Sequence, residues 1–418
     1  MAPWAELPRL TPSSTRPCRR RSTRLPPDSR WSAPVIEAGA GQSGYLYLDD
    51  QAKFDRFIAS LSGADLLAVD TEAASFHRYR DRVYLIQLSS RTATAIVDPL
   101  TVADLGSLGA LLADPGLETL FHDADYELRI LNRDYGFTAT RLFDTRIAAQ
   151  LLNEPGIGLA ALLEKYLGVT LDKRWQRADW SRRPLEQGML DYAASDTRSL
   201  PTLRDLLKDQ LEAGGRWSWA EEEFSLLSAI RWSPAGTPEE AYLRVKGVRT
   251  LKGHQLTVLR EVFAWRERVA DELDRAVFRV VMNDPMLAIA RAMPADEQAL
   301  RELKVLSPEQ VRRWGAEILA AVRRGVEAPA ASIPVFERSR RPPPDLAYDA
   351  RLERLKSVRN AIAAELPLAP GVLCPNAILE AIARQEPASL EGLTEIGEMR
   401  RWQRAVLGER LIAALSAA

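Results

Sequence analysis

Two acidic residues stand at the end of an apolar stretch, in the tripeptide Asp70-Thr71-Glu72. The stretch that leads into them, LLAVD at residues 66–70, predicts a buried strand. Because side chains alternate along a strand, Asp70 and Glu72 would point to the same side of the sheet. Two crowded carboxylates repel each other, and hard divalent cations such as Mg²⁺ relieve that repulsion. The tripeptide therefore predicts a metal site, with solvated acidic turn residues as the alternative.

A second acidic group lies in FHDADYELRIL, residues 121–131, where a short strand gives way to a helix. Asp123 and Asp125 fall at the first turn of that helix, where acidic residues cap free N–H groups and favour the helix dipole, so we expect them to cap. Glu127 lies deeper in the helix, toward the sheet edge. It is the better candidate for a metal ligand.

The third group is LDYAASDTRSL, residues 190–200. Tyr192 and Asp196 are four residues apart and would therefore share one face of a helix. A phenol could position an attacking water and a carboxylate could hold a metal ion. A simple Tyr–Asp surface pair would give the same spacing.

These groups need a scaffold, and the chain from Gly44 alternates short apolar runs with amphipathic stretches, which is typical of an α/β domain. The predicted strands are residues 66–70, 83–88, 95–97 and 119–122. The predicted helices are residues 105–112, 124–133, 145–152, 159–167 and 187–210. Residues 234–238 (PAGTP) form a break, after which 239–325 is helical in pattern. Residues 328–345 resemble a Pro-rich linker, and 346–418 form a second helical unit. The two helical units share a layout that includes Trp314 and Trp402, which predicts an internal duplication.

Composition limits the class of protein. A chain of 418 residues with 46% hydrophobic content should divide into two or three domains. Its formal net charge of -1 gives no global field that would attract nucleic acid, so any such attraction must be local. Cys18 and Cys374 match no metal-ligand spacing and suit a reducing compartment. No apolar run approaches the roughly 20 residues that span a bilayer, and we expect a cytoplasmic protein.

Residues 1–43 have a different composition. Seven arginines and the single Asp28 lie between Arg9 and Arg30, interleaved with Pro, Ser and Thr, so this segment should be disordered. An RNA-binding arm, an organelle transit peptide and an extension without a role are all compatible with it.

With its three acidic groups in this order, the sequence resembles the ribonuclease D branch of the DEDD exonucleases. The resemblance extends through VDTEAASFHRYRDRVYLIQLSS, FDTRIAAQLL and LEKYLGVTLDKRWQRADWSRRPL, and LKGHQLTVLREVFAWRERVADELDRAVFRVVMND resembles an HRDC domain. It covers roughly Gly44 to Ala418. It implies an α/β ribonuclease H-like exonuclease domain with a mixed central sheet (44–233), followed by two all-α HRDC helical-bundle domains (234–327 and 346–418).

The resemblance implies two divalent cations, Mg²⁺ or Mn²⁺. Asp70 would bridge them, Glu72 and Asp196 would complete the first site, and Tyr192 would orient the nucleophilic water. Glu127 would hold the second ion, although the family normally places an aspartate at that position. The extra methylene still allows binding, directly or through water.

The implied activity is 3′-5′ removal of nucleotides from structured RNA such as tRNA precursors. A local basic patch in the first HRDC domain could contact phosphates; it comprises Arg244, Lys246, Arg249 and Lys252. A DNA exonuclease of the same fold and a nucleic-acid-binding protein with a decayed site remain alternatives.

Overall fold

The computed structural model describes residues 44–234, 236–336 and 345–416. The basic segment 1–43 and the prolines at 342–344 lie outside the described residues. Within the described ranges, no helix is long and apolar enough to cross a membrane.

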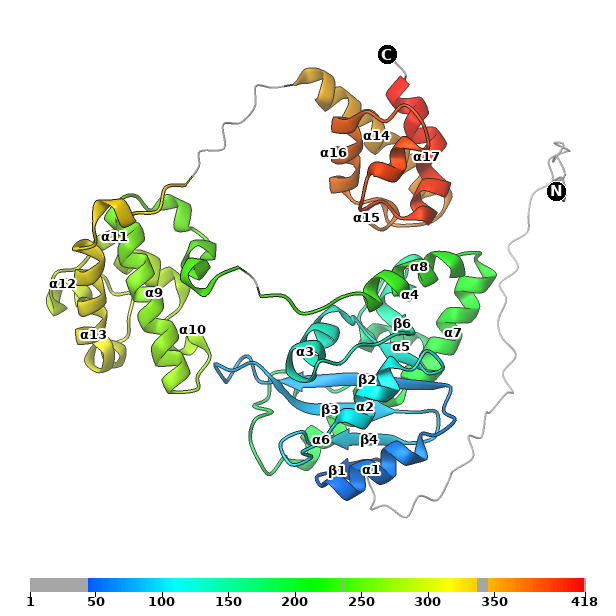
Figure 1. Cartoon of the computed structure of the whole chain (residues 1–418), viewed down its shortest axis with the longest axis horizontal. Helices are drawn as coiled ribbons and strands as arrows, with labels where there is room; N and C mark the ends of the chain where they lie inside the picture. The colour runs from blue at the N-terminus through cyan, green and yellow to red at the C-terminus, as the bar shows by residue number, and fades with distance from the viewer. Residues whose placement is uncertain (1–43, 235, 337–344, 417–418) are drawn as a thin grey trace, which may run out of the picture. The chain divides into compact units, whose positions relative to one another are not determined.

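The first domain is built on one six-stranded sheet (Figure 1). Its strands are β1 (Leu46–Leu48), β2 (Leu66–Ala73), β3 (Val83–Ser89), β4 (Thr94–Val97), β5 (Glu118–Phe121) and β6 (Leu142–Asp144). They are arranged in the order β1-β4-β3-β2-β5-β6. The β2–β3 and β3–β4 pairs are antiparallel, whereas β1–β4, β2–β5 and β5–β6 are parallel. The predicted mixed central sheet is confirmed.

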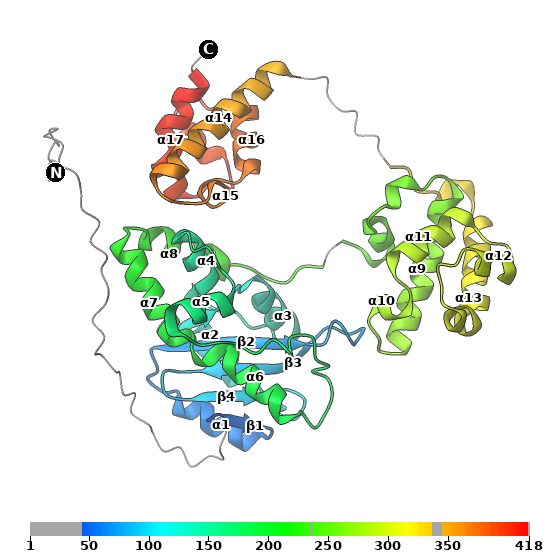
Figure 2. The ribbon, with the colours of Figure 1, turned by 180° about the vertical axis from the view of Figure 1, so that it is seen from behind.

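Helices cover both faces of this sheet, which explains why every residue of β3 is buried. The helices are α1 (Gln51–Ser60), α2 (Gly106–Ala113), α3 (Asp125–Tyr135), α4 (Thr145–Leu151), α5 (Leu159–Leu167), α6 (Gln187–Arg198), α7 (Leu200–Ala213) and α8 (Trp217–Ser228). The α6 helix packs on β2, β3 and β4 from one face, and α2 and α3 lie on the other, as the two opposite views show (Figures 1 and 2). The sheet face beneath α6 carries the polar residues discussed below.

The prediction of one helix over residues 187–210 was wrong. The chain breaks at Ser199, and α7 begins at Leu200 with Pro201 in its first turn. A proline fits the first turn because its missing N–H would have no partner inside the helix. The short strands β1 and β6 and the helices α1 and α8 were not predicted.

The two helical units share a similar internal arrangement. The first contains α9 (His254–Glu272), α10 (Val277–Val280), α11 (Asn283–Ala292), α12 (Glu297–Glu302) and α13 (Pro308–Val326), and the second contains α14 (Leu346–Glu365), α15 (Pro370–Leu373), α16 (Asn376–Gln385) and α17 (Arg401–Ser416). Short 3₁₀ helices occur at η1 (Pro238–Arg244), η2 (Val248–Thr250), η3 (Ala330–Ser332) and η4 (Gly392–Glu395). The 3₁₀ segment η4 of the second unit stands where the first unit has α12.

A buried arginine marks the duplication. Arg266 on α9 donates to the Val281 carbonyl at 3.4 Å and to the Asn283 Oδ1 at 2.7 Å. Arg359 on α14 makes the equivalent bonds to residues at the same sequence separations, the Cys374 carbonyl at 3.1 Å and the Asn376 Oδ1 at 2.6 Å. A buried guanidinium needs such acceptors to offset the loss of water. The matching networks bear out the predicted duplication.

Candidate active site

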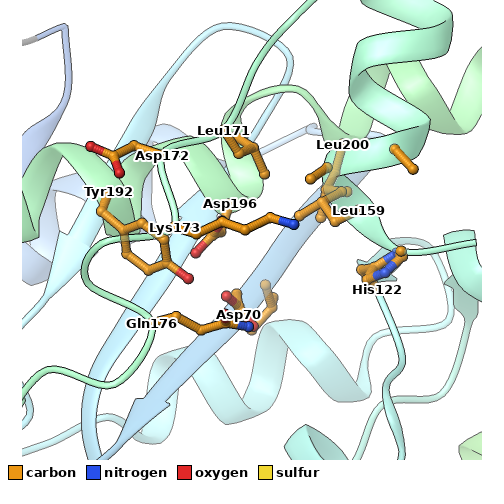
Figure 3. Close-up of a pocket in the computed structure, with 14 residues that line it drawn as sticks. Asp70, His122, Leu159, Leu171, Asp172, Lys173, Gln176, Tyr192, Asp196 and Leu200 are labelled. Carbon is orange, nitrogen blue, oxygen red and sulfur yellow. The ribbon is translucent and has the colours of Figure 1, made fainter.

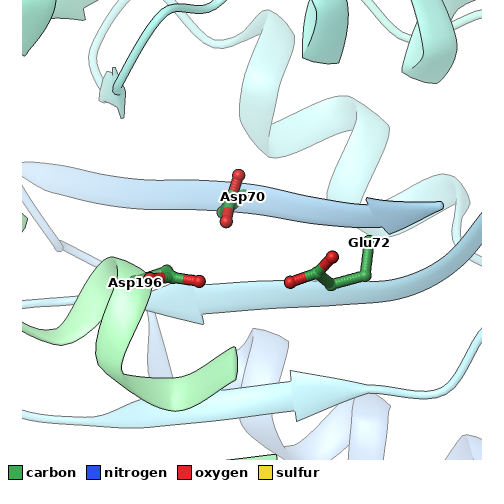
Figure 4. A group of neighbouring side chains, drawn as sticks. All are labelled: Asp70, Glu72 and Asp196. Carbon is green, nitrogen blue, oxygen red and sulfur yellow. The ribbon is translucent and has the colours of Figure 1, made fainter. Parts of the chain in front are cut away.

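Three carboxylates meet beneath α6. Asp70 and Glu72 come from β2, Asp196 comes from α6, and one carboxylate oxygen from each lies within 4.8 Å of the others (Figure 4). Asp70 and Glu72 share a face because they are two residues apart on a strand. Asp196 reaches them because α6 packs directly over β2 and β3.

Burial and mutual repulsion make this cluster difficult to ionise. Burial raises the pKa of Asp70 to about 7. Burial and the nearby Asp70 charge raise the pKa of Asp196 to about 8. The pKa of Glu72 also lies well above its ordinary value, because of burial and then the charges of its carboxylate neighbours. Oxygen ligands that cannot share one volume as free anions fit a hard divalent cation such as Mg²⁺ or Mn²⁺.

Glu127 lies on α3, close to this cluster but outside the group within 4.8 Å. Burial raises the pKa of Glu127, and the second cause is the Asp70 charge. Its Oε2 atom is buried and has no hydrogen-bond partner in the described part of the chain. This carboxylate oxygen is buried near Asp70 and accepts no hydrogen bond, so it is suited to binding a cation.

The two neighbouring aspartates behave differently from Glu127. The expected capping by Asp123 and Asp125 was wrong, because no side chain caps α3 at its N-terminus. Asp125 instead pairs with Arg129 at 2.8 Å, four residues along the exposed side of the helix. Asp123 pairs with Arg146. Neither aspartate is therefore free to replace Glu127 in the cluster.

Tyr192 lies one helical turn before Asp196 and interacts with it. A hydrogen bond from the Tyr192 hydroxyl lowers the pKa of Asp196, against the larger opposing effect of burial. Burial and the adjacent carboxylates raise the pKa of Tyr192 above its ordinary value, so the phenol stays protonated at neutral pH. Its ring packs against Trp180, with ring centroids 6.0 Å apart. Because Asp196 is only 8% exposed, the two residues are not a simple surface pair.

A pocket of about 390 Å³ opens over Asp70, Tyr192 and Asp196 (Figure 3). Its other walls come from the start of α5 and from the loop between α5 and α6, which contributes Lys173 and Gln176. Both side chains extend into the pocket (Figure 3). Sequence reasoning missed these two residues, because a polar loop carries no periodicity. Two signals were available: both residues lie in the segment LEKYLGVTLDKRWQRADWSRRPL that carries the family resemblance, and this segment leads into the Tyr192 helix.

His122 also lines the pocket. Its Nδ1 lies 2.9 Å from the Thr145 hydroxyl, which fixes the ring. Burial lowers the pKa of His122 to about 4, so the ring is neutral at physiological pH. The contact with Thr145 gives His122 a structural role, since it connects the end of β5 to the start of α4.

The predicted phosphate-binding residues of the first helical unit lie on its 3₁₀ turns or directly after them, and all four are exposed: Arg244, Lys246, Arg249 and Lys252. No salt bridge occupies any of these four side chains within the described ranges. The Arg249 guanidinium lies 5.5 Å from the centre of the Phe336 ring. The surface remains available to an anionic partner.

Comparisons with known proteins agree with this geometry. The model of a 3′-5′ exonuclease family matches residues 45–212, and the HRDC domain model matches residues 255–322 and 349–415. These ranges fall inside the predicted domains, whose boundaries stay predictions. Over 357 residues the chain is 30% identical to ribonuclease D of Granulibacter bethesdensis, covering 83% of this chain and 86% of that protein.

Ribonuclease D of Escherichia coli is similar in both sequence and structure. It is 33% identical over 269 residues, which cover 64% of this chain and 71% of that protein. The crystal structure of E. coli RNase D, described as an exoribonuclease involved in structured RNA processing, aligns with a TM-score of 0.66 and 25% identity. That alignment covers 89% of this chain and 98% of the crystallised one.

Proposed function

The chain belongs to the ribonuclease D family of 3′-5′ exonucleases with HRDC domains, and we propose that it removes 3′-terminal nucleotides from structured RNA with the help of two divalent cations. The main support is the group of three carboxylates within 4.8 Å of one another beside a protonated tyrosine. Precursors of tRNA are the substrates we favour, since the E. coli relative acts in structured RNA processing.

In this proposal Asp70, Glu72 and Asp196 hold one cation, and Asp70 with Glu127 holds the other. Bound divalent cations would lower the pKa of an attacking water and offset the charge that develops on the leaving 3′ oxygen. The raised carboxyl pKa values support this assignment, because the residues need positive charge in order to ionise together.

The protein's own groups orient the reaction. The Tyr192 hydroxyl keeps its proton and donates a hydrogen bond to Asp196, so its oxygen lone pairs are left to accept a hydrogen bond from the attacking water. Packing against Trp180 fixes the direction of the phenol. The Lys173 ammonium and the Gln176 amide extend into the same pocket and can hold the phosphate oxygens (Figure 3). Hydrolysis then releases a nucleoside 5′-monophosphate and leaves a 3′ hydroxyl on the shortened RNA.

The test is a cleavage assay with purified full-length protein, Mg²⁺ or Mn²⁺, and 3′-labelled RNA and DNA oligomers. We expect mononucleotide release from RNA and its loss in Asp70→Asn. Asp125→Asn is the matched control, because Asp125 is an exposed acid that pairs with Arg129 near the same site. A preference for DNA would favour a DNA exonuclease of the same fold, and RNA binding without cleavage would favour a binding protein.

Glu127→Asp tests the longer acidic side chain in the same assay. We expect equal or greater activity than in the wild type, because the shorter residue matches the family pattern. A misplacement of about 1 Å in a catalytic group can cost about 100-fold in rate. A large loss of activity in Glu127→Asp would therefore show that this site is built around glutamate.

A further inference from the structure

Gln87 is a polar residue in the centre of the most buried strand. It lies on β3 and is 0% exposed. Both its Nε2 and its Oε1 lack a hydrogen-bond partner among the described residues. An amide buried without partners lowers the free energy of unfolding by roughly 1–3 kcal/mol for each lost bond. A methionine of similar shape would avoid that cost, so the amide calls for an explanation other than packing.

The sheet register places Gln87 beside the carboxylate cluster. Gln87 is the cross-strand partner of Asp70 in the antiparallel β2–β3 pair. Directly opposed residues point to the same face, with their Cβ atoms roughly 4.5–5.5 Å apart. The two side chains form no hydrogen bond in this structure. A glutamine side chain is nevertheless long enough to span that separation.

Ser89 lies two residues from Gln87 on the same face of β3, and its hydroxyl already has partners. The Ser89 hydroxyl lies 3.0 Å from that of Thr94 and 2.8 Å from that of Thr197 on α6. These contacts connect α6 to β3, and they satisfy the Ser89 hydroxyl without a hydrogen bond from the Gln87 amide. Asp70, by contrast, accepts no side-chain hydrogen bond from any residue of the described ranges and has only a backbone hydrogen bond from Thr71. A carboxylate without a side-chain donor therefore stands opposite a donor without an acceptor.

We propose that Gln87 is a positioning residue: when a divalent cation binds, its side-chain amide turns to donate a hydrogen bond to the Asp70 carboxylate and fixes the orientation of that carboxylate toward the cation. The proposal rests on the function proposed above, because it gives Asp70 a cation to hold. Residues that orient metal ligands through hydrogen bonds typically change metal affinity by about 10–100-fold when they are replaced.

The test is Mn²⁺ titration of the full-length protein by calorimetry, with Gln87→Met as the variant and Gln87→Leu as a second apolar replacement. We expect Mn²⁺ binding about 10–100-fold weaker than in the wild type. We also expect a metal-free Tm equal to or above that of the wild type, because the substitution removes unsatisfied polar atoms. On RNA, kcat should fall at limiting Mn²⁺ and recover with excess Mn²⁺, while KM for RNA stays unchanged.

Thr119→Val is the matched control. Thr119 is also 0% exposed, and its hydroxyl also lacks a partner in the described chain. It lies on β5 opposite Leu67 and so does not face Asp70. We expect Thr119→Val to keep the Mn²⁺ affinity of the wild type.

Wild-type Mn²⁺ affinity in either Gln87 variant would overturn the positioning role, whether or not its Tm changes. Equal weakening in Thr119→Val would also overturn it, since the effect would then belong to core packing. A wild-type protein that binds no Mn²⁺ would instead overturn the proposed function, and this inference with it.

Discussion

The carboxylate cluster should make the metal-free protein less stable as the pH rises, and Asp70→Asn should remove much of that loss. The pKa of Asp70 is raised by burial to about 7, against about 4 for an exposed aspartate. The folded state therefore holds a proton that the unfolded state has released between about pH 4 and pH 7. Over that window the free energy of unfolding falls by about 1.4 kcal/mol per pH unit for each such proton.

The raised pKa gives a magnitude for this effect. Three pH units at that slope correspond to about 4 kcal/mol for Asp70. The proton on Asp70 makes its full contribution to the free energy of unfolding below about pH 4, and this contribution is lost above about pH 7. Asparagine keeps the shape of the side chain and cannot ionise, so at pH 8 Asp70→Asn should be more stable than the wild type by up to about 4 kcal/mol. For a domain of this size that difference corresponds to a rise in Tm of roughly 8–16 °C.

The assay is thermal unfolding of metal-free protein in EDTA, followed by circular dichroism at pH 5 and pH 8. Hydrogen exchange in peptides from β2 and α6 assigns the change to this domain. The free energy of unfolding of Asp70→Asn should exceed that of the wild type by a difference several times larger at pH 8 than at pH 5. Mn²⁺ at pH 8 should raise the Tm of the wild type much more than that of the variant.

Asp125→Asn serves as the control, because Asp125 is exposed and its pairing with Arg129 lowers its pKa instead of raising it. We expect Asp125→Asn to change the free energy of unfolding only slightly, and any decrease should be present at both pH 5 and pH 8. If the wild type and Asp70→Asn lose stability equally between pH 5 and pH 8, burial does not hold a proton on Asp70 and the reasoning is wrong.

Two further predictions concern the first helical unit. The double variant Lys246→Ala/Lys252→Ala removes two exposed cations, so the slope of log binding constant against log salt for single-stranded RNA should become shallower by about 1.4. Fluorescence anisotropy at several salt concentrations measures it, and an unchanged slope would show that these lysines do not contact phosphates. Gly325→Ala would place a Cβ atom 2.4 Å from the Val258 Cα, so it should lower the free energy of unfolding by roughly 1–3 kcal/mol. Thermal unfolding tests this against Gly371→Ala, where nothing lies within 4 Å of the new atom.

Much of the first domain could be predicted because its central elements have strong patterns. The apolar runs of β2 and β3 and the spacing of α5 gave those elements within a few residues. The missed strands β1 and β6 have only three residues each, too few for any alternation to appear. Their place in the sheet depends on pairing with distant segments, which sequence periodicity does not report.

The α1 helix carried a signal that was overlooked. Asp50 caps it by accepting from the Lys53 N–H at 2.8 Å, and Phe54 and Phe57 are buried at helical spacing. An N-cap followed by apolar residues three apart is typical of a helix start. The break before α7 had a signal too, since Pro201 disfavours continuation of the preceding helix.

The site was only partly predictable, for a reason that its residues make clear. Asp70, Glu72 and Asp196 stand in short local motifs, so their chemistry could be proposed before their proximity was known. Gln87 stands in no motif. Its interest comes from a strand register that places it opposite Asp70, and from two amide atoms left without partners.

A fold selected for stability alone would not contain this group of side chains. Acidic residues and amides are poor strand formers, yet Asp70, Glu72 and Gln87 occupy neighbouring positions on the two central strands. Each lowers the stability of the metal-free domain, through a raised carboxyl pKa or through unpaired polar atoms. Local rules are broken in this way mainly at functional sites, where a ligand restores the balance. In our proposals Asp70 and Glu72 bind a cation, and Gln87 orients Asp70 toward it. One bound cation would therefore explain why all three destabilising residues are present.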